Sequence, residues 1–364
     1  MVSCKQHIKN IQRDSDILAG RSDFICLDRN ERISSFPKAV LADMLSNVSS
    51  KLFTAYPSLE ETYGKLSDFT GLAVENICLG AGSDSLIRRA FQAYLRSGEK
   101  VLTPEPTYGM YAVWAEVFCA KLVTVKYGPD LKINVDDFIS LIDDDTRIVV
   151  IVSPDQPTGA VFKANDIRRI ASATAQTNSL LIIDEAYYPF HPETAVSLLN
   201  DFDHLLIIRS FSKIAGIAGL RVGYALSSLE IVRSLHAVRS PGEVNSMGAL
   251  AASYLLDHSE ILDDFKQDVE KGRKLLVTAA NKLGWGVPNC AGNFQLLKLS
   301  PEINPENLAS LLKKKGYLIK TGFNHDAMLN MVRITLDGPD VIQPFIEILA
   351  ETIKEISNDA NIIS

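Results

Sequence analysis

The stretch RSFSKIAGIAGLRVGY, from Arg209 to Tyr224, places one lysine among small residues and three glycines, directly after the apolar run HLLII. Such a run predicts a buried strand. In open α/β sheets ligands bind at the carboxyl ends of the strands, so this strand brings Lys213 to the edge of a pocket. A lysine in a partly desolvated pocket loses its charge more readily and can form an imine with a carbonyl. The stretch therefore predicts an α/β sheet with a reactive lysine at its edge.

The residues after the lysine fit a bulky ligand. Gly216, Gly219 and Gly223 let the backbone pass close to it, and Arg221 can hold a phosphate with two donors. The alternative is an ordinary solvated lysine in a glycine-rich loop. Seven residues at fixed positions in this stretch favour the ligand site.

Similar apolar runs recur upstream of this stretch. They are rich in Val and Ile and bounded by turn residues: KVLTP, KLVTVKY, RIVVIVSP and SLLIIDEAYY. Runs of this kind suit strands covered on both faces. Helix-length amphipathic segments lie between several of them, which predicts an α/β domain built on a mostly parallel sheet.

The pattern changes near residue 246. Long helical segments follow, and then the strand-like runs NFQLLKL, YLIKTGF and MVRITL. We therefore predict three parts: an N-terminal arm over residues 1–30, a large domain over 31–245 and a small C-terminal domain over 246–364.

Composition narrows the class of protein. The chain has 364 residues, 46% of them apolar, and a formal charge of −7, which describes a globular protein without the basic stripe that binds nucleic acid. Its five cysteines form no C-x-x-C pair, and no apolar run reaches membrane length. The start MVSCKQHIKNIQRDSD has no apolar stretch after its positive charges, so we do not expect it to be a secretory signal. We expect a cytoplasmic protein that binds neither nucleic acid nor membrane, and we assign no metal ligands.

The spacing of Ser210, Ser212, Lys213, the three glycines and Arg221 resembles the signature S-x-S-K-x-x-G-x-x-G-x-R-x-G of the class I and II aminotransferases. The resemblance implies pyridoxal 5'-phosphate as cofactor, held covalently by Lys213, with Ser210, Ser212 and Arg221 around its phosphate. Such a cofactor also needs a carboxylate that keeps its ring nitrogen protonated. Asp184 in LLIIDEAYYPF suits that role, although a strand-terminal Asp could simply cap a helix.

Further segments resemble the family's cofactor contacts. In LGAGSDSLIRRAF, Gly82, Ser83 and Asp84 open a helix whose amides can hold a phosphate, although Ser and Asp are also common helix caps. The resemblance places Tyr187 against the ring hydroxyl and Tyr108 on the ring face, where an ordinary core tyrosine is the alternative.

Two more residues are assigned by resemblance. AYPS is similar to the family's R-Y-P segment, whose tyrosine, here Tyr56, reaches the cofactor phosphate of the other subunit. This implies a homodimer with shared active sites. Arg333 in MVRITL suits two-point capture of a substrate carboxylate, the alternative being a surface arginine on a half-exposed strand.

Taken in order from residue 27 to beyond 333, these motifs resemble the histidinol-phosphate aminotransferases. The resemblance implies fold type I: a large domain with a mostly parallel seven-stranded sheet, and a small α/β domain. It also implies amino transfer between an amino acid or amino compound and an oxo acceptor. A decarboxylase similar to threonine-phosphate decarboxylase, and a non-catalytic protein that kept the fold, are the alternatives.

Three positions depart from that pattern. SPDQPTG has Gln156 where the family has an asparagine bonded to the ring hydroxyl, and YLIKTGF has Lys320 where an arginine faces the substrate phosphate. SDILAGRSDF lacks the tyrosine that serves the same phosphate. Lysine is a compact charge without the planar two-point grip of arginine. We therefore expect an anionic substrate other than histidinol phosphate.

Overall fold

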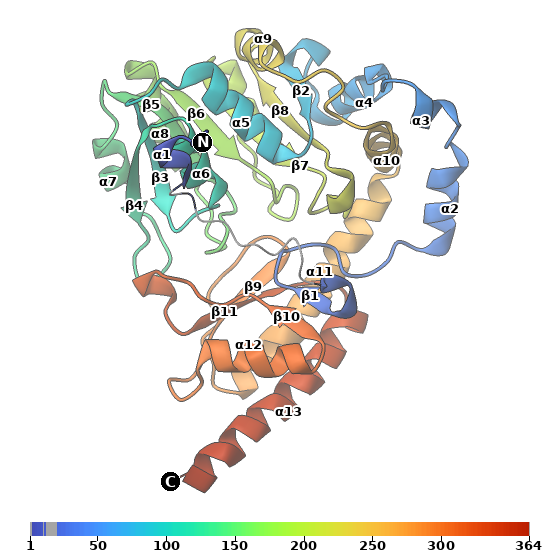
Figure 1. Ribbon diagram of the computed structural model, residues 1–364, viewed down its shortest axis with the longest axis vertical. Coiled ribbons are helices and arrows are strands. Elements are labelled where there is room, and N and C mark those ends of the chain that lie inside the picture. The colour runs from blue at the N-terminus through green and yellow to red at the C-terminus, as the bar shows by residue number, and fades with distance from the viewer. Residues whose placement is uncertain (1, 10, 12–19, 364) are drawn as a thin grey trace.

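The computed structural model describes residues 2–9, 11 and 20–363, and its centre is a seven-stranded sheet (Figure 1). The strands stand in the order β2-β8-β7-β6-β5-β3-β4. Their bounds are Ile77–Gly80 for β2, Lys100–Glu105 for β3, Lys121–Lys126 for β4, Thr146–Val152 for β5, Leu180–Asp184 for β6, Leu205–Ser210 for β7 and Gly223–Ser227 for β8.

The strands β4, β3, β5, β6 and β7 run parallel, and β8 alone is antiparallel to both of its neighbours, β7 and β2. Parallel neighbours end at the same edge of the sheet, so the loops after β3, β5, β6 and β7 meet there. This architecture, completed by a smaller α/β lobe, is the predicted fold class, which is confirmed.

Helices cover both faces of the central strands of this sheet, which explains why those strands are apolar without alternation. The run at β4, expected to be covered on both faces, is instead an edge strand whose residues are exposed or half-buried. On β5, Ile148 and Val150 pack in one core cluster, while Val149 and Ile151 pack in another. The first cluster includes residues of α5 (Ser83–Tyr94), α6 (Met110–Val117) and α9 (Leu229–Ala237). The second includes residues of α4 (Glu60–Thr70), α8 (Ala164–Gln176) and α10 (Ser246–Asp257).

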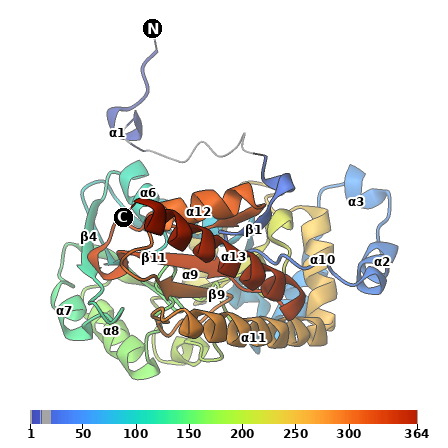
Figure 2. The same ribbon diagram turned by 90° about the horizontal axis from the view of Figure 1, so that it is seen from below.

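The smaller lobe combines two short sheets with three helices (Figure 2). The strand β9 (Phe294–Lys298) pairs antiparallel with β11 (Met331–Thr335), and β1 (Ile25–Leu27) pairs parallel with β10 (Tyr317–Ile319). The helices are α11 (Ser259–Lys282), α12 (Pro305–Lys314) and α13 (Pro339–Ile363). The strands β9 and β11 lie between α11 and the helices α12 and α13 (Figure 2). A bridge between Lys320 and Arg333 joins the two sheets.

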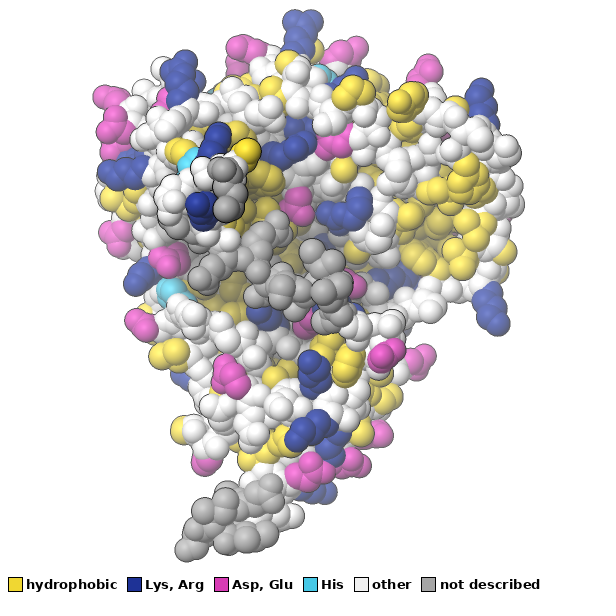
Figure 3. Space-filling view, viewed as in Figure 1, with side chains coloured by type: hydrophobic (Ala, Val, Ile, Leu, Met, Phe, Trp, Pro, Cys, Tyr) yellow, Lys and Arg dark blue, Asp and Glu magenta, His cyan; other side chains and the backbone are white. Residues whose placement is uncertain are grey.

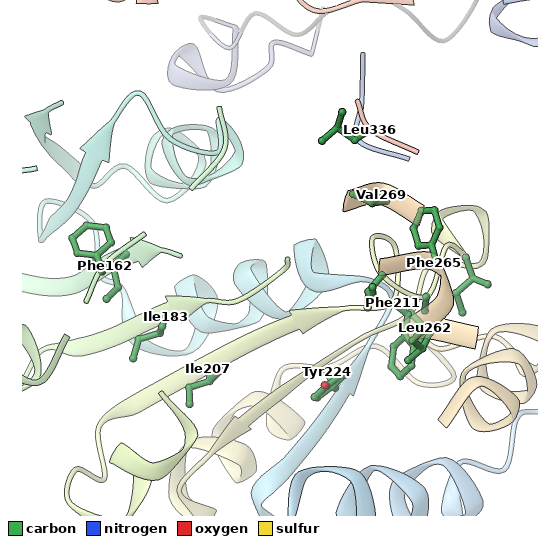
Figure 4. Close-up of a cluster of buried hydrophobic side chains, with 14 of the residues drawn as sticks. Phe162, Ile183, Ile207, Phe211, Tyr224, Leu262, Phe265, Val269 and Leu336 are labelled. Atoms are coloured by element: carbon green, nitrogen blue, oxygen red, sulfur yellow. The ribbon is translucent and has the colours of Figure 1, made fainter. Parts of the chain in front are cut away.

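One core links the two lobes. Ile183, Ile207 and Tyr224 of the large sheet belong to the same buried cluster as Phe265 and Val269 of α11 (Figure 4). The strand β1, inside the predicted arm, pairs with a strand of the small lobe, and α10 packs against α4 of the large one. Residues 1, 10 and 12–19 of that arm lie outside the described residues. The division at residues 30 and 245 stays a prediction.

The remaining helices are short or peripheral. Their bounds are Gln6–Lys9 for α1, Lys38–Ser46 for α2, Lys51–Thr54 for α3 and Val135–Ser140 for α7. Over the part of the chain that the structure describes, no helix combines the length and the apolar character needed to cross a bilayer.

Candidate active site

A cavity of about 480 Å³ opens at the edge where the parallel strands of the large sheet end. Ten of the residues assigned from the sequence line it: Ser83, Asp84, Tyr108, Gln156, Asp184, Tyr187, Ser210, Ser212, Lys213 and Arg221. They come from five chain segments, four of which follow β3, β5, β6 and β7. The topology therefore brings together residues more than a hundred positions apart.

Lys213 lies three residues beyond the end of β7. Its Nζ donates hydrogen bonds to the backbone carbonyls of Arg29 at 3.0 Å and Asn30 at 3.1 Å. Burial lowers the pKa of this amine to about 8, and the positive charge of Arg333 acts in the same direction. An amine with this pKa is partly neutral near neutral pH, as a nucleophile or a base must be.

Asp184 is the last residue of β6 and is 2% exposed. Its carboxylate accepts hydrogen bonds from the Tyr111 hydroxyl at 2.8 Å and from the backbone N–H of Ala186 at 3.0 Å. Burial raises the pKa of Asp184 to about 6, while these two bonds oppose the rise. Among the described residues no cation forms an ion pair with Asp184. A cationic group of a ligand would therefore stabilise this buried carboxylate.

One end of the cavity is built for an anion. Gly82 caps the N-terminus of α5 with φ of +78°, and a Cβ there would lie 2.6 Å from Nη2 of Arg221. The other guanidinium nitrogen, Nη1, lies 3.3 Å from Oγ of Ser212. Helix N-terminal amides, a guanidinium and serine hydroxyls are all groups that can donate to an anion, and we call this end of the cavity the anion cradle.

Asp84 stands in the same cradle with a carboxylate that would repel a phosphate. Its two oxygens are already used, since Oδ1 accepts the Tyr108 hydroxyl at 2.7 Å and Oδ2 lies 3.4 Å from Nη2 of Arg221. Only the backbone N–H of Asp84 is therefore suited to an anion. Its side chain instead orients Tyr108 and Arg221.

Tyr187 lies at the boundary of the two lobes. Its hydroxyl accepts a hydrogen bond from Nδ2 of Asn30 at 2.8 Å, and burial raises its pKa to about 12. Its ring packs edge-on against Phe294 of β9, with centroids 5.4 Å apart. The hydroxyl is therefore neutral and fixed in direction.

Arg333 does not line the cavity itself but stands behind it on β11, only 3% exposed. One nitrogen, Nη2, donates to the carbonyl of Asp28 at 2.6 Å, while Nε and Nη1 are buried without a hydrogen-bond partner in the described structure. Unpartnered buried donors are costly, so this guanidinium has capacity for an anionic ligand.

Lys320 is exposed and exchanges both backbone hydrogen bonds with Arg333, at 3.1 and 2.9 Å. Residues paired in this way project to the same face of a sheet. The lysine is thus a neighbour of Arg333, although it lies outside the cavity wall.

Tyr56 is exposed to solvent over 90% of its surface. It follows α3 and lies beside Gly242. Three other exposed apolar residues come from the same region: Leu41 and Leu45 of α2 and Phe53 of α3, the last 71% exposed. Figure 3 shows apolar side chains gathered where Figure 1 places α2 and α3. Within one chain, the structure does not bring Tyr56 to the cavity.

Sequence reasoning missed several residues of the site. Arg29 and Glu31 line the cavity, and Asn30 and Tyr111 hold Tyr187 and Asp184. The signal for the first three was the segment LDRNE directly after a short apolar run, and for Tyr111 its place one helical turn after Tyr108. No group of three or more metal-ligating side chains was found among the described residues.

The chain was compared with known proteins. Residues 25–349 match the family model described as "Aminotransferase class I and II". A histidinol-phosphate aminotransferase from Caldanaerobacter subterraneus subsp. tengcongensis is 31% identical over 332 residues, 90% of this chain and 93% of that protein. Another from Dehalococcoides mccartyi is 34% identical over 292 residues, 79% of this chain and 78% of that protein.

The fold is also similar to that of solved structures. The crystal structure of histidinol-phosphate aminotransferase from Sinorhizobium meliloti in complex with pyridoxal-5'-phosphate superposes with a TM-score of 0.86. It is 21% identical in sequence, and the match covers 99% of each chain.

Proposed function

This chain belongs to the class I and II aminotransferases, enzymes that work with pyridoxal phosphate, and on that premise we propose which of its residues hold the cofactor and the substrate. The observation that carries the proposal is the convergence of three groups on one cavity: the amine of Lys213, the buried carboxylate of Asp184 and the anion cradle at Arg221. The family membership and the names of the relatives support amino transfer rather than decarboxylation or a non-catalytic role.

The cradle suits the cofactor's phosphate. Arg221, Ser210, Ser212 and the first amides of α5 would hold it, and the missing side chain at Gly82 leaves the space beside the guanidinium. The charge of the phosphate suits both the guanidinium and the positive end of the helix dipole.

The part of the cavity around Asp184 suits the cofactor's ring. Asp184 would pair with the protonated ring nitrogen, Tyr108 would cover one ring face, and Tyr187 and Gln156 would bond to the ring hydroxyl. The proposal is supported by the burial of Asp184, because a buried carboxylate without a cation gains from meeting one. Gln156 has the same amide group as the asparagine found in the family, but its side chain is longer.

When bound, the cofactor supplies an electron-accepting ring that makes a proton on the substrate's α carbon easier to remove. Lys213 is the base for that proton. The Nζ amine is buried and has a pKa of about 8. At neutral pH it can therefore take a proton and later return it. Arg333 and the backbone carbonyls of Arg29 and Asn30 orient this amine by charge and by hydrogen bonds.

We propose that the substrate is an amino compound with a carboxylate or phosphate that pairs with Arg333. The two unpartnered donors of this guanidinium support a two-point contact. Lys320, on the same sheet face, adds a positive charge nearby. The relatives carry the name of histidinol phosphate, which makes that compound the required comparison, while Lys320 in place of an arginine leads us to expect a different anionic substrate.

We further propose a homodimer in which Tyr56 of each subunit contributes its hydroxyl to the phosphate held by the other. An exposed tyrosine beside the exposed apolar residues Leu41, Leu45 and Phe53 supports this, since a contiguous apolar surface favours association. A cytoplasmic setting also remains a prediction.

The test follows single half-reactions by the absorbance of the bound cofactor. Wild type is mixed with glutamate, aromatic amino acids, small phosphorylated amines and histidinol phosphate, and Arg333→Lys serves as the variant. We expect conversion by an anionic donor, and a loss of about tenfold or more in its specificity constant in Arg333→Lys, because lysine cannot form the paired contact. Absence of conversion by every donor would contradict the proposed function, and a highest specificity constant for histidinol phosphate would contradict the substrate expectation.

A further inference from the structure

Asp155 is a fully buried carboxyl group that the proposed function does not use. It lies three residues after the end of β5 and has no exposed surface. Its Oδ1 accepts the hydroxyl of Thr107 at 2.7 Å, and its Oδ2 accepts the hydroxyl of Tyr127 at 2.6 Å. No ion pair to this carboxyl was found in the described structure, although a buried carboxylate without a cation is costly.

The hydrogen bonds of Asp155 connect three neighbouring strands. Thr107 follows β3 and Tyr127 follows β4, while Asp155 itself follows β5, and these strands are adjacent and parallel. Thr107 precedes Tyr108, and Asp155 precedes Gln156. Both of these following residues line the cavity, one proposed for the ring face and the other for the ring hydroxyl. One carboxyl therefore fixes the separation of two loops that carry cofactor contacts.

The surroundings of Asp155 favour the uncharged form. Burial raises its pKa to about 8, and the negative charge of Asp184 acts in the same direction, while the bonds from Tyr127 and Thr107 oppose the rise. The phenols that face it, Tyr127 and Tyr187, both have raised pKa values and stay neutral in this range. In mildly alkaline solution the carboxyl would ionise with only hydroxyl and amide donors around it.

We propose that Asp155 is a positioning residue for the cofactor: as an uncharged carboxyl it holds the loops of Tyr108 and Gln156 together, and its ionisation adds a buried negative charge that disfavours the anionic cofactor. This inference rests on the proposed cofactor site. Asparagine has a similar shape with one donor and one acceptor and cannot ionise. It should therefore replace the uncharged form and remove the part of the pH dependence that Asp155 causes.

The experiment measures the dissociation constant of pyridoxal phosphate for the full chain, wild type and Asp155→Asn, between about pH 6.5 and pH 9.5. Titration of Lys213 also changes the affinity with pH, but equally in both proteins, so their ratio isolates Asp155. We expect dissociation constants within about threefold at the acidic end, and binding at least about tenfold tighter in Asp155→Asn at the alkaline end. Asp144→Asn, a change at an exposed carboxyl just before β5, is the control and should follow wild type throughout.

A second variant separates positioning from folding. Asp155→Ala should bind the cofactor about tenfold or more weakly at every pH and lose circular dichroism in the cofactor's absorption band, because the ring is no longer held in one orientation. Asp155→Asn should keep that signal. A pH-independent affinity ratio, or an Asp155→Ala protein with wild-type affinity and dichroism, would overturn this inference alone. A wild type that binds no cofactor would end both this inference and the proposed function.

Discussion

The chemistry of Lys213 depends on its position, since a free lysine has a pKa near 10.4. Here burial lowers the pKa to about 8, and the only hydrogen-bond acceptors found for Nζ in the described structure are two backbone carbonyls. Neutral carbonyls stabilise the ammonium form less than a carboxylate would. The same amine can therefore be a nucleophile and a proton acceptor near neutral pH.

This pKa predicts how the apoprotein captures pyridoxal phosphate. Because the neutral amine is the nucleophile and the pKa is lowered, the rate of capture should rise with pH through about 8 and then level off. Stopped-flow absorbance over the range from about pH 6 to pH 10.5 measures this rate. Lys213→Arg is the control and should show no fast phase. A rate that still rises tenfold per pH unit above pH 9 would contradict the assigned pKa.

Gln156 tests how closely the site follows its family. Gln156→Asn shortens the side chain by one methylene and keeps the amide, so we expect cofactor binding to be retained and the turnover rate to change by less than about tenfold. That range corresponds to one neutral hydrogen bond, about 0.5 to 1.5 kcal/mol. Steady-state kinetics and cofactor titration measure it. A loss beyond a hundredfold would show that the longer side chain has a specific role.

The turn from β2 into α5 is the element that forms the anion cradle, which we propose holds the cofactor's phosphate. Gly82→Ala should weaken cofactor binding by tenfold or more, because a side chain at φ of +78° is strained by about 1 to 3 kcal/mol and its Cβ would meet Arg221. Gly98→Ala is the matched control, since Gly98 has φ of +88° and no atom within 4 Å of the added Cβ. Both variants should lose thermal stability, but only Gly82→Ala should lose affinity for the cofactor. Equal affinities would contradict the cradle.

The strands that the sequence predicts well are those buried on both faces. The runs at β3, β5, β6 and β7 are apolar without alternation, and their continuity is visible without any knowledge of the neighbours. β2 and β8 were not predicted, because β2 has only four residues and β8 begins with the last glycine of the glycine-rich stretch after Lys213. Their pairing, Gly80 with Gly223, depends on a chain separation that no local pattern reveals.

The same contrast holds for the site. Lys213, Asp184 and Arg221 stand in recognisable local segments, so the sequence alone predicts their place in a cavity. Glu31 and Tyr111 were not assigned, because the local signals at LDRNE and after Tyr108 acquire a role only when β1 pairs with β10 and α6 packs on the sheet. Asp155 is a polar residue in a turn by sequence, and only its burial marks it out.

The whole molecule is expected to work as a pair of chains. Phe53→Glu places a charge in the exposed apolar surface formed by Leu41, Leu45, Phe53 and Tyr56, and should convert a dimer into monomers with weaker cofactor binding. Leu122→Glu is the control, because Leu122 is 37% exposed on β4 at the far edge of the sheet. Sedimentation velocity measures the outcome. A wild type that sediments as a monomer while fully active would contradict shared active sites.

The central claim is that pyridoxal phosphate is held by Lys213. Borohydride reduction of the loaded protein makes that covalent link permanent, and proteolysis followed by mass spectrometry locates it. We predict one modified peptide, carrying the reduced cofactor on Lys213 and absent from Lys213→Ala. A modification on another lysine, with Lys213 unmodified, would contradict the account of the site.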